Sequence, residues 1–179
     1  MGRRAGEGVD RERELAQLRA LAEDGWGWIA VVGPAGVGKS AFGARAPDAL
    51  GLPAVTVSLR GSVEPRALLG AIAGELQLGD ASEAAVAAAL RARSPCMLVL
   101  DDADEALVEL GPVLARMTAS AREALVLGLS RRRPAHAGAV VIELGPLALD
   151  AGAGEEPPAL TLFAARLAAQ RGGRPLEPS

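Results

Sequence analysis

Residues 33–40 read Gly-Pro-Ala-Gly-Val-Gly-Lys-Ser and fit the pattern G-x-x-x-x-G-K-[ST] at every fixed position. The glycines permit positive φ angles, so that main-chain N–H groups can point into one anion-sized hollow. Of the 19 lysine and arginine residues only Lys39 is a lysine, and a compact ammonium suits a phosphate at this position. The apolar run 28–32 predicts a buried strand before the pattern, and the residues after it favour a helix. Because this context is complete, we interpret the segment as a phosphate-binding loop rather than a glycine-rich turn that matches by chance.

The loop predicts how a nucleoside triphosphate would be bound. Lys39 is expected to reach the β and γ phosphates, and the Ser40 hydroxyl to hold a magnesium ion that bridges the same oxygens. The positive end of the following helix points at the same place. The residues expected to bind the nucleotide through this loop are Gly33, Pro34, Ala35, Gly36, Val37, Gly38, Lys39, Ser40 and Ala41.

Composition excludes several other classes of protein. The chain has 179 residues, enough for one domain with a core, and a net charge of −3, which argues against a general nucleic-acid surface. A single cysteine, Cys96, excludes an internal disulfide and fits a reducing compartment. The sequence shows neither a run of about 18 apolar residues, as a membrane span requires, nor the apolar core of a signal peptide. We therefore expect a cytoplasmic protein that binds neither membranes nor, through this segment, nucleic acid.

Strand and helix patterns alternate along the chain, which is typical of an α/β fold with a parallel sheet between two layers of helices. The predicted strands are 28–32, 53–59, 96–100, 124–129 and 139–144, and the predicted helices are 11–23, a helix from 41 that Pro47 ends near 45, a helix from Pro65, 82–93, 104–117 with an interruption at Gly111-Pro112, and 158–171. We expect a three-layer P-loop NTPase fold with a mainly parallel five-stranded sheet. Its segments are an N-terminal helix and adenine-side segment (1–24), the core (25–147), and a linker with a C-terminal helix that begins a truncated lid (148–179).

Two acids end the third predicted strand, 96–100. In an open α/β sheet the ligand lies at the carboxyl ends of the strands, so Asp101 and Asp102 are expected beside the nucleotide. Asp101 would hold the magnesium ion through water, and Asp102 would orient or deprotonate the attacking water. The alternative interpretation is that both aspartates cap a helix.

The fourth predicted strand ends on Ser130-Arg131. An arginine at this edge of the sheet is suited to contact a γ-phosphate and so to report its presence. The alternative is a solvated basic loop, because Arg131 begins the run Arg131-Arg132-Arg133-Pro134.

The order of these motifs resembles the nucleotide-binding domain of STAND ATPases, signal-transducing relatives of AAA+ proteins that include NB-ARC domains. The resemblance covers nearly the whole chain and rests on the opening 9–15, the loop 33–40, the strand and acids 98–102, the Ser-Arg pair 130–131, and the segment 144–147 before a Leu-Phe helix. It implies that Val9 and Arg11 line the adenine pocket, although Asp10 stands where the family has glycine. It also implies that Arg131 is the phosphate-sensing arginine, although Gly128-Leu129 differs from the usual residues before it.

The resemblance implies a nucleotide-controlled signalling switch that uses ATP, ADP and Mg²⁺ and hydrolyses ATP slowly, with Lys39, Asp102 and Arg131 as its catalytic residues. Its partners would be a helical lid, winged-helix or repeat domains further along a longer protein, with possible nucleotide-driven self-association. Two other hypotheses remain: a nucleotide-dependent scaffold without turnover, and an AAA+ motor-type ATPase. The base preference rests on the resemblance alone, since no Asn-Lys-x-Asp guanine motif or other residue pattern decides it.

Overall fold

The computed structural model describes residues 11–25, 27–59, 64–109, 111–121, 124–135 and 138–146. Val9, Asp10 and the predicted helix 158–171 lie outside these residues. The proposed segment 148–179 does so as well, and the division of the chain into three segments therefore stays a prediction.

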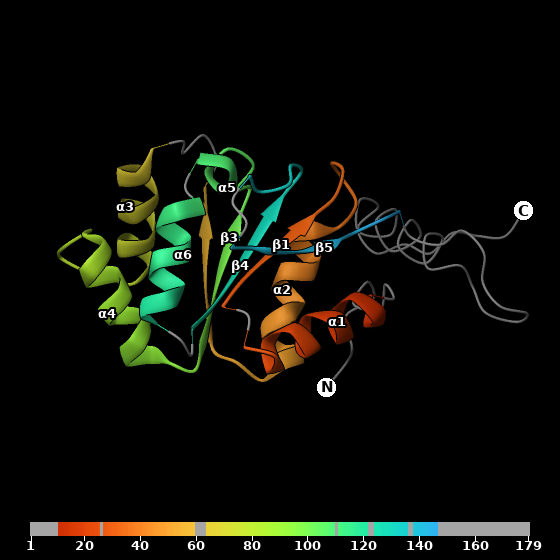
Figure 1. Cartoon of the computed structure of the whole chain (residues 1–179), viewed down its shortest axis with the longest axis horizontal. Helices are drawn as coiled ribbons and strands as arrows, with labels where there is room; N and C mark the ends of the chain where they lie inside the picture. Colours follow the sequence, from red (N-terminus) through yellow and green to blue (C-terminus); the bar gives the residue numbers. More distant parts are fainter. Residues whose placement is uncertain are drawn as a thin grey trace, which may run out of the picture. The chain divides into compact units, whose positions relative to one another are not determined.

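One or two helices lie between successive strands, from the first strand to the fourth, in the described part of the chain (Figure 1). In order they are α1 (Glu12–Glu23), β1 (Trp28–Val32), α2 (Lys39–Leu50), β2 (Ala54–Ser58), α3 (Pro65–Glu75), α4 (Glu83–Arg93), β3 (Cys96–Asp101), α5 (Ala106–Glu109), α6 (Gly111–Ser120), β4 (Ala124–Ser130) and β5 (Val140–Glu143). No helix within this part is both long and apolar enough to cross a lipid bilayer.

The five strands form one sheet in the order β2-β3-β4-β1-β5, and every neighbouring pair is parallel. The predicted fold class is thereby confirmed. Strand β4 lies between β1 and β3, with Val32 of β1 beside Ser130 and Leu100 of β3 beside Gly128. The carboxyl ends of these three strands therefore meet at one edge of the sheet.

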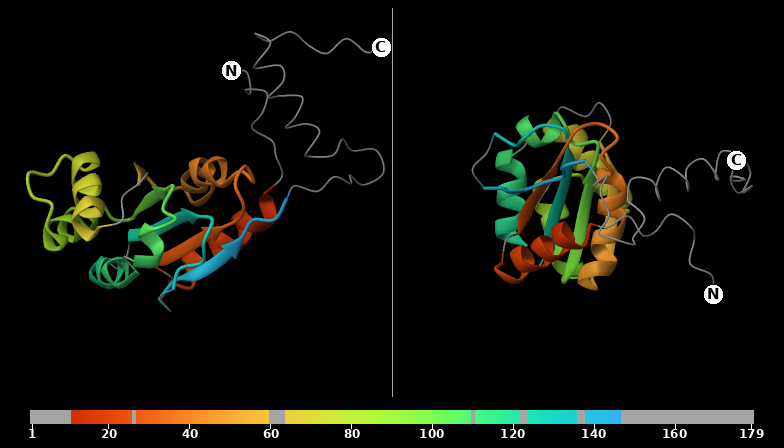
Figure 2. Two further views of the ribbon diagram at one scale, coloured as in Figure 1. Left: turned by 90° about the horizontal axis from the view of Figure 1, so that it is seen from above. Right: turned by 90° about the vertical axis from the view of Figure 1, so that its right-hand side faces the viewer.

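Alternate residues of the strands point to opposite faces of the sheet, and each face carries its own core. On one face, Ile29 and Val31 pack in a cluster with Leu18 of α1 and Phe42 of α2. On the other, the cluster contains Ala30 of β1 together with buried residues of α3, α4 and α6, including Leu68, Leu90 and Leu114. Figure 2 shows the sheet between these two layers of helices. The cores fix the sheet and hence the edge where the loop 33–40 lies.

The predicted end of the loop's helix near residue 45 is wrong. Helix α2 continues through Pro47 to Leu50 and ends at Gly51, whose φ is +68°. Proline removes one main-chain donor, but Pro47 is buried in the packed face of α2, and its carbonyl accepts a hydrogen bond from Leu52 N at 3.0 Å. Tertiary packing thus outweighs the helix-breaking tendency of proline for one more turn.

The predicted interruption at Gly111-Pro112 is also misplaced. Helix α5 ends at Glu109 and helix α6 begins at Gly111, so Pro112 lies in the first turn of α6. Proline is favoured there because the first N–H groups of a helix have no partner within it. The Gly-Pro pair starts a helix instead of breaking one.

Gly128 in β4 is required for close packing against α5. A Cβ atom at this position would lie 2.7 Å from Cδ2 and 2.9 Å from Cδ1 of Leu107, which is fully buried. We expect Gly128→Ala to lower the free energy of unfolding by about 1–3 kcal/mol, the usual cost of overpacking a core. The measurement is urea denaturation.

Gly70→Ala is the matched control, since Gly70 lies inside α3 and an added Cβ there meets nothing within 4 Å. This variant should raise the free energy of unfolding by about 0.5–1 kcal/mol. Equal effects of the two substitutions would contradict the packing argument.

Candidate functional site

The candidate site lies at the carboxyl edge of the sheet. Strand β1 ends at Val32, and the loop that follows leads directly into α2 at Lys39. The main-chain N–H of Gly33 donates to the carbonyl of Ser130, at 3.1 Å, so the first residue of the loop is bonded to the end of β4. In such sheets ligands bind outside the carboxyl ends of the strands.

Two glycines give the loop its shape. Gly36 has a φ of +77° and Gly38 a φ of +100°, and Gly38 is also the N-cap residue of α2. A Cβ at either position would meet no atom within 4 Å, so the backbone conformation, and not space, favours glycine. The predicted strand, loop and helix are all present, as β1, residues 33–38 and α2.

Lys39 is hydrogen-bonded to the main chain of the same loop. Its Nζ donates to the carbonyl oxygens of Gly33, at 2.8 Å, and Pro34, at 2.9 Å. An ammonium group has three N–H donors, so one more remains after these two bonds. The positive charge therefore sits at the mouth of the loop, where the sequence predicted a phosphate contact.

Ser40 and Asp101 come together across 61 residues of sequence. The Ser40 hydroxyl donates to Oδ1 of Asp101 at 3.1 Å, which joins the first turn of α2 to the end of β3. A hydroxyl and a carboxylate are oxygen ligands of the kind that Mg²⁺ prefers, and Mg²⁺ usually takes only one or two protein carboxylates. No cluster of three or more His, Cys, Asp or Glu side chains able to hold a metal ion occurs in the described ranges. The pair fits a magnesium ion shared with phosphates and water.

Asp102 follows in an uncommon backbone conformation. Its φ is +52°, in the left-handed region, and its main-chain N–H donates to Oδ1 of Asp101 at 2.9 Å. Aspartate tolerates this region better than most residues. Helix α5 begins only at Ala106, so neither Asp101 nor Asp102 occupies the N-cap position directly before it.

Arg131 lies at the carboxyl end of β4 and is paired with an acid that the sequence analysis did not assign to the site. Its main-chain N–H and its Nε both donate to the carboxylate of Asp104, with Nε 2.5 Å from Oδ2. The Arg131 side chain is 62% exposed and the Asp104 side chain 17% exposed. The sequence analysis places Asp104 only at the start of a helical stretch. The one sequence feature that could assign it to the site is its position as a third acid close behind Asp101-Asp102.

The charge on Asp104 follows from its surroundings. Burial raises the pKa of its carboxyl, but the hydrogen bonds from Arg131 and Ser130 outweigh that effect and leave the pKa below its ordinary value. Asp104 is thus a carboxylate at neutral pH. Arg133 of the same basic run instead pairs with Glu143 of the edge strand β5.

The adenine-side residues are less fully placed. Arg11 immediately precedes α1, whereas Val9 lies outside the described residues. The role of this pair in holding a base stays a prediction.

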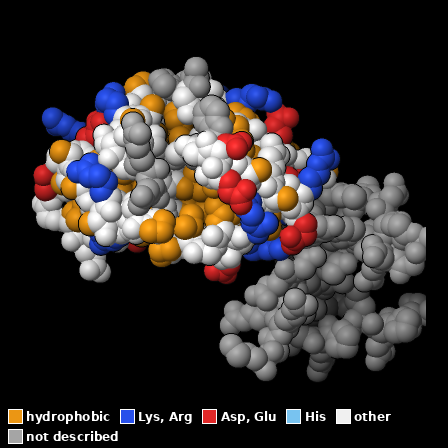
Figure 3. Space-filling view, turned by 60° about the horizontal axis from the view of Figure 1, so that its bottom comes forward, with side chains coloured by type: hydrophobic (Ala, Val, Ile, Leu, Met, Phe, Trp, Pro, Cys, Tyr) orange, Lys and Arg blue, Asp and Glu red, His pale blue; other side chains and the backbone are white. Residues whose placement is uncertain are grey.

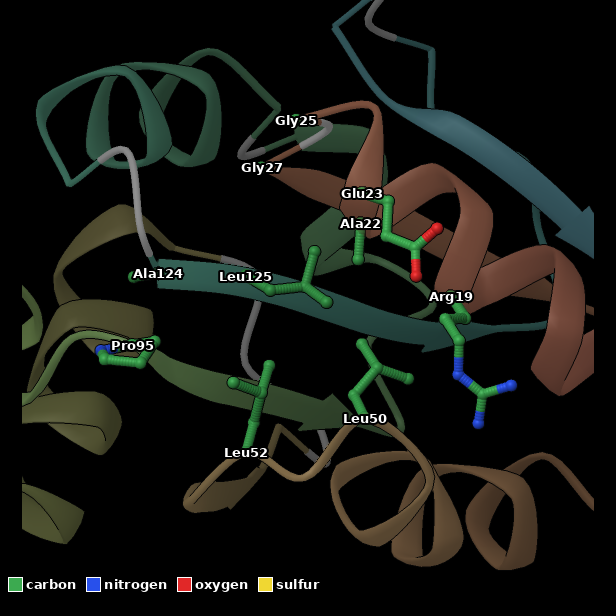
Figure 4. A pocket seen from close by; sticks show the side chains of 10 residues that line it. All are labelled: Arg19, Ala22, Glu23, Gly25, Gly27, Leu50, Leu52, Pro95, Ala124 and Leu125. Atoms are coloured by element: carbon green, nitrogen blue, oxygen red, sulfur yellow. The ribbon is translucent and has the colours of Figure 1, made fainter.

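A separate cavity of about 560 Å³ lies at the opposite, amino edge of the sheet. Its lining includes Leu50, Leu52 and Leu125, with Arg19 and Glu23 of α1 at one side (Figure 4). Figure 3 turns the lower side of the Figure 1 view forward and shows exposed hydrophobic side chains between charged ones. This cavity contains none of the residues of the loop or of Asp101, Asp102 and Arg131.

Comparisons with known proteins agree with this geometry. A family model described as an AAA domain matches residues 22–133, well over half of the chain. Among solved structures, one similar fold is that of the Signal Transduction ATPase with Numerous Domains (STAND) protein with a tetratricopeptide repeat sensor from Pyrococcus horikoshii, with a TM-score of 0.50 and 17% identity. The match covers 90% of this chain and 28% of that chain. A search of curated protein sequences gave no match.

Proposed function

The chain belongs to the AAA domain family, and from this premise we propose that it binds ATP and ADP through the loop 33–41 and acts as the nucleotide-responsive core of a larger regulator. The carrying observation is the bond between Ser40 and Asp101, 3.1 Å long, beside a loop that already encloses the Lys39 ammonium. A glycine-rich turn that matched the motif by chance would not be expected to lie beside a hydroxyl, a carboxylate and the only lysine of the chain at one edge of a sheet. The AAA family and a STAND-like fold are those that the sequence motifs predicted.

Ser40 and Asp101 would hold a magnesium ion together with phosphate oxygens, Asp101 directly or through water. When bound, the ion supplies positive charge that neutralises the β and γ phosphates. The side chains of both residues already lie within hydrogen-bond distance, so this chain presents the two oxygens as a pair. The Lys39 ammonium would contact the same phosphates from the loop side.

Slow hydrolysis of ATP is the activity that these groups fit best. Asp102 is exposed beside the Ser40–Asp101 pair and is proposed to orient the attacking water and to accept its proton. Arg131 is proposed to contact the γ-phosphate from the end of β4. Phosphoryl transfer requires mainly positioning and charge stabilisation, so a few side chains suffice.

The regulatory role is part of the same proposal. The matched STAND protein carries a tetratricopeptide repeat sensor, and this chain spans 28% of its length. We infer that a helical lid, winged-helix or repeat domains pack against this core differently when the γ-phosphate is present and when it is absent. Nucleotide-driven self-association and a cytoplasmic location belong to this proposal as well.

Calorimetry on the wild-type chain with ATP, ADP and GTP, each with Mg²⁺ and with EDTA, tests the proposed function. We expect ATP and ADP to bind, removal of Mg²⁺ to weaken ATP binding by about tenfold, as the loss of one charge-assisted contact predicts, and GTP to bind more weakly than ATP. Absence of binding by both adenine nucleotides would refute the proposal. Equal affinities for ATP and GTP would refute the adenine preference alone.

A further inference from the structure

Asp104 joins the loop after β3 to the end of β4 through one carboxylate. Oδ1 accepts hydrogen bonds from the Ser130 hydroxyl, at 3.1 Å, and from the main-chain N–H of Arg131. Oδ2 accepts a hydrogen bond from Nε of Arg131. The same carboxylate thus fixes both the main chain and the side chain of Arg131.

The residues around this carboxylate are held firmly. Ser130 is fully buried, and its hydroxyl oxygen accepts a further hydrogen bond from Arg132 N at 2.9 Å. The N–H of Ala103, also fully buried, donates to the carbonyl of Leu129 at 3.0 Å. The backbone on either side of the Asp104–Arg131 contact is therefore fixed by hydrogen bonds to buried residues. The Asp104 carboxylate can thus determine where the exposed Arg131 side chain lies.

The network continues to the phosphate-binding loop. The carbonyl of Ser130 accepts the N–H of Gly33 at 3.1 Å, while the hydroxyl of the same residue contacts Asp104. One dipeptide, Ser130-Arg131, is thus bonded to the loop on one side and to Asp104 on the other. A change in the position of Asp104 would therefore alter the contacts of both Arg131 and the loop.

The contact through Nε leaves most of the guanidinium for another ligand. Arginine carries five N–H donors, of which Nε supplies one and the two Nη groups four. Asp104 uses the Nε donor. The Nη groups carry the paired donors that suit a phosphate, whose oxygens arginine binds in a bidentate manner.

We propose that Asp104 is the positioning residue of Arg131, which it holds by Nε so that the Nη groups face the γ-phosphate and give the site its preference for ATP over ADP. This inference rests on the proposed function, because it assigns Asp104 a task at the same nucleotide site. ADP lacks the γ-phosphate, so its affinity does not depend on Asp104. The effect of Asp104 on ATP passes through Arg131 and disappears when Arg131 is removed.

The Asp104→Asn variant separates this role from a purely structural one. Its amide oxygen can still accept the hydrogen bonds from Ser130 and from the main chain of Arg131, whereas its NH₂ group faces the Nε donor and cannot accept from it. The side-chain contact to Arg131 is lost and the main-chain contact is kept. Glu83→Gln is the matched control, because Glu83 forms a two-bond pair with the Arg116 guanidinium, linking α4 and α6, at 2.9 and 3.0 Å.

Calorimetry with ADP and with a non-hydrolysable ATP analogue, in Mg²⁺, measures the ratio of the two affinities for the wild type, Asp104→Asn, Arg131→Ala, the double variant and Glu83→Gln. We expect Asp104→Asn to lower the preference for the ATP analogue by about tenfold, the usual worth of a charge-assisted hydrogen bond, with ADP affinity unchanged. In the Arg131→Ala background the same substitution should have no further effect, and Glu83→Gln should behave as wild type.

Each other outcome has a distinct meaning. An unchanged preference in Asp104→Asn, or an equal loss of affinity for both nucleotides, would overturn this inference while leaving the proposed function intact. A further tenfold loss in the Arg131→Ala background would overturn it as well, because Asp104 would then act independently of Arg131. Failure of the wild-type chain to bind either nucleotide would overturn the proposed function and this inference together.

Discussion

Replacement of Lys39 by alanine is expected to weaken the binding of ATP and ADP by about 100-fold without unfolding the protein. The ammonium is hydrogen-bonded to the carbonyls of Gly33 and Pro34. The remaining N–H donor would form one hydrogen bond between charged groups, worth up to about 3 kcal/mol, which corresponds to an affinity loss of about 100-fold. The two lost contacts to carbonyl groups lie at a partly exposed position, where water can replace Lys39, so the free energy of unfolding should fall by about 1 kcal/mol or less.

The matched control removes the same charge at the opposite edge of the sheet. Arg91 lies in the last turn of α4, which leads to the amino end of β3, and its side chain donates to the carbonyl of Ser120. Arg91→Ala should leave nucleotide affinity within about twofold of wild type, since surface charges beyond a Debye length of about 8–10 Å are largely screened. Calorimetry measures the affinities, and urea denaturation measures the stabilities. Tight ATP binding by a folded Lys39→Ala variant would contradict the assignment of the loop.

The sequence predicted those features that local patterns determine. The motif at 33–40 is contiguous, so its spacing predicted the loop, while the apolar run 28–32 and the residues after the motif predicted the strand before it and the start of the helix after it. The α/β class followed from the alternation of strand and helix patterns, and the sheet of five parallel strands confirms it. The predicted helix 82–93 corresponds to α4, and it too depends on local signals, since the N-cap bond from Ala85 N to the Ser82 hydroxyl lies within one turn.

The features that the sequence did not predict depend on contacts between distant segments. Asp104 and Arg131 are separated by 27 residues, and no periodicity connects an acid after one strand with an arginine after the next. Pro47 lies within helix α2 and is buried, and helix propensity along the sequence does not predict that burial. Gly128, a departure from the related family's pattern, is explained only when the side chain of Leu107 is seen to occupy the space of a Cβ.

Substitution of Asp102 by asparagine is expected to stop ATP turnover while ATP still binds. A positioned general base contributes about 10²–10⁴-fold to a reaction rate, so phosphate release should fall by at least about 100-fold. Asparagine is the appropriate replacement because it also tolerates the φ of +52° at this position, whereas alanine would add backbone strain. The contacts assigned to ATP belong to Lys39, Ser40, Asp101 and Arg131 and not to Asp102, so affinity for ATP should stay within about twofold, which is the range expected when no phosphate contact is removed.

The neighbouring acid gives the sharpest comparison for this result. Asp101→Asn alters the carboxylate that accepts from Ser40 and should weaken Mg²⁺-dependent ATP binding, whereas Asp102→Asn should affect turnover alone. Asp24→Asn, an exposed acid between α1 and β1 at the amino edge, should change neither. Unchanged phosphate release in Asp102→Asn would exclude this residue as the base. Binding without turnover by the wild-type full-length protein would instead favour the nucleotide-dependent scaffold, because the same loop and metal pair would then serve ligand binding without chemistry.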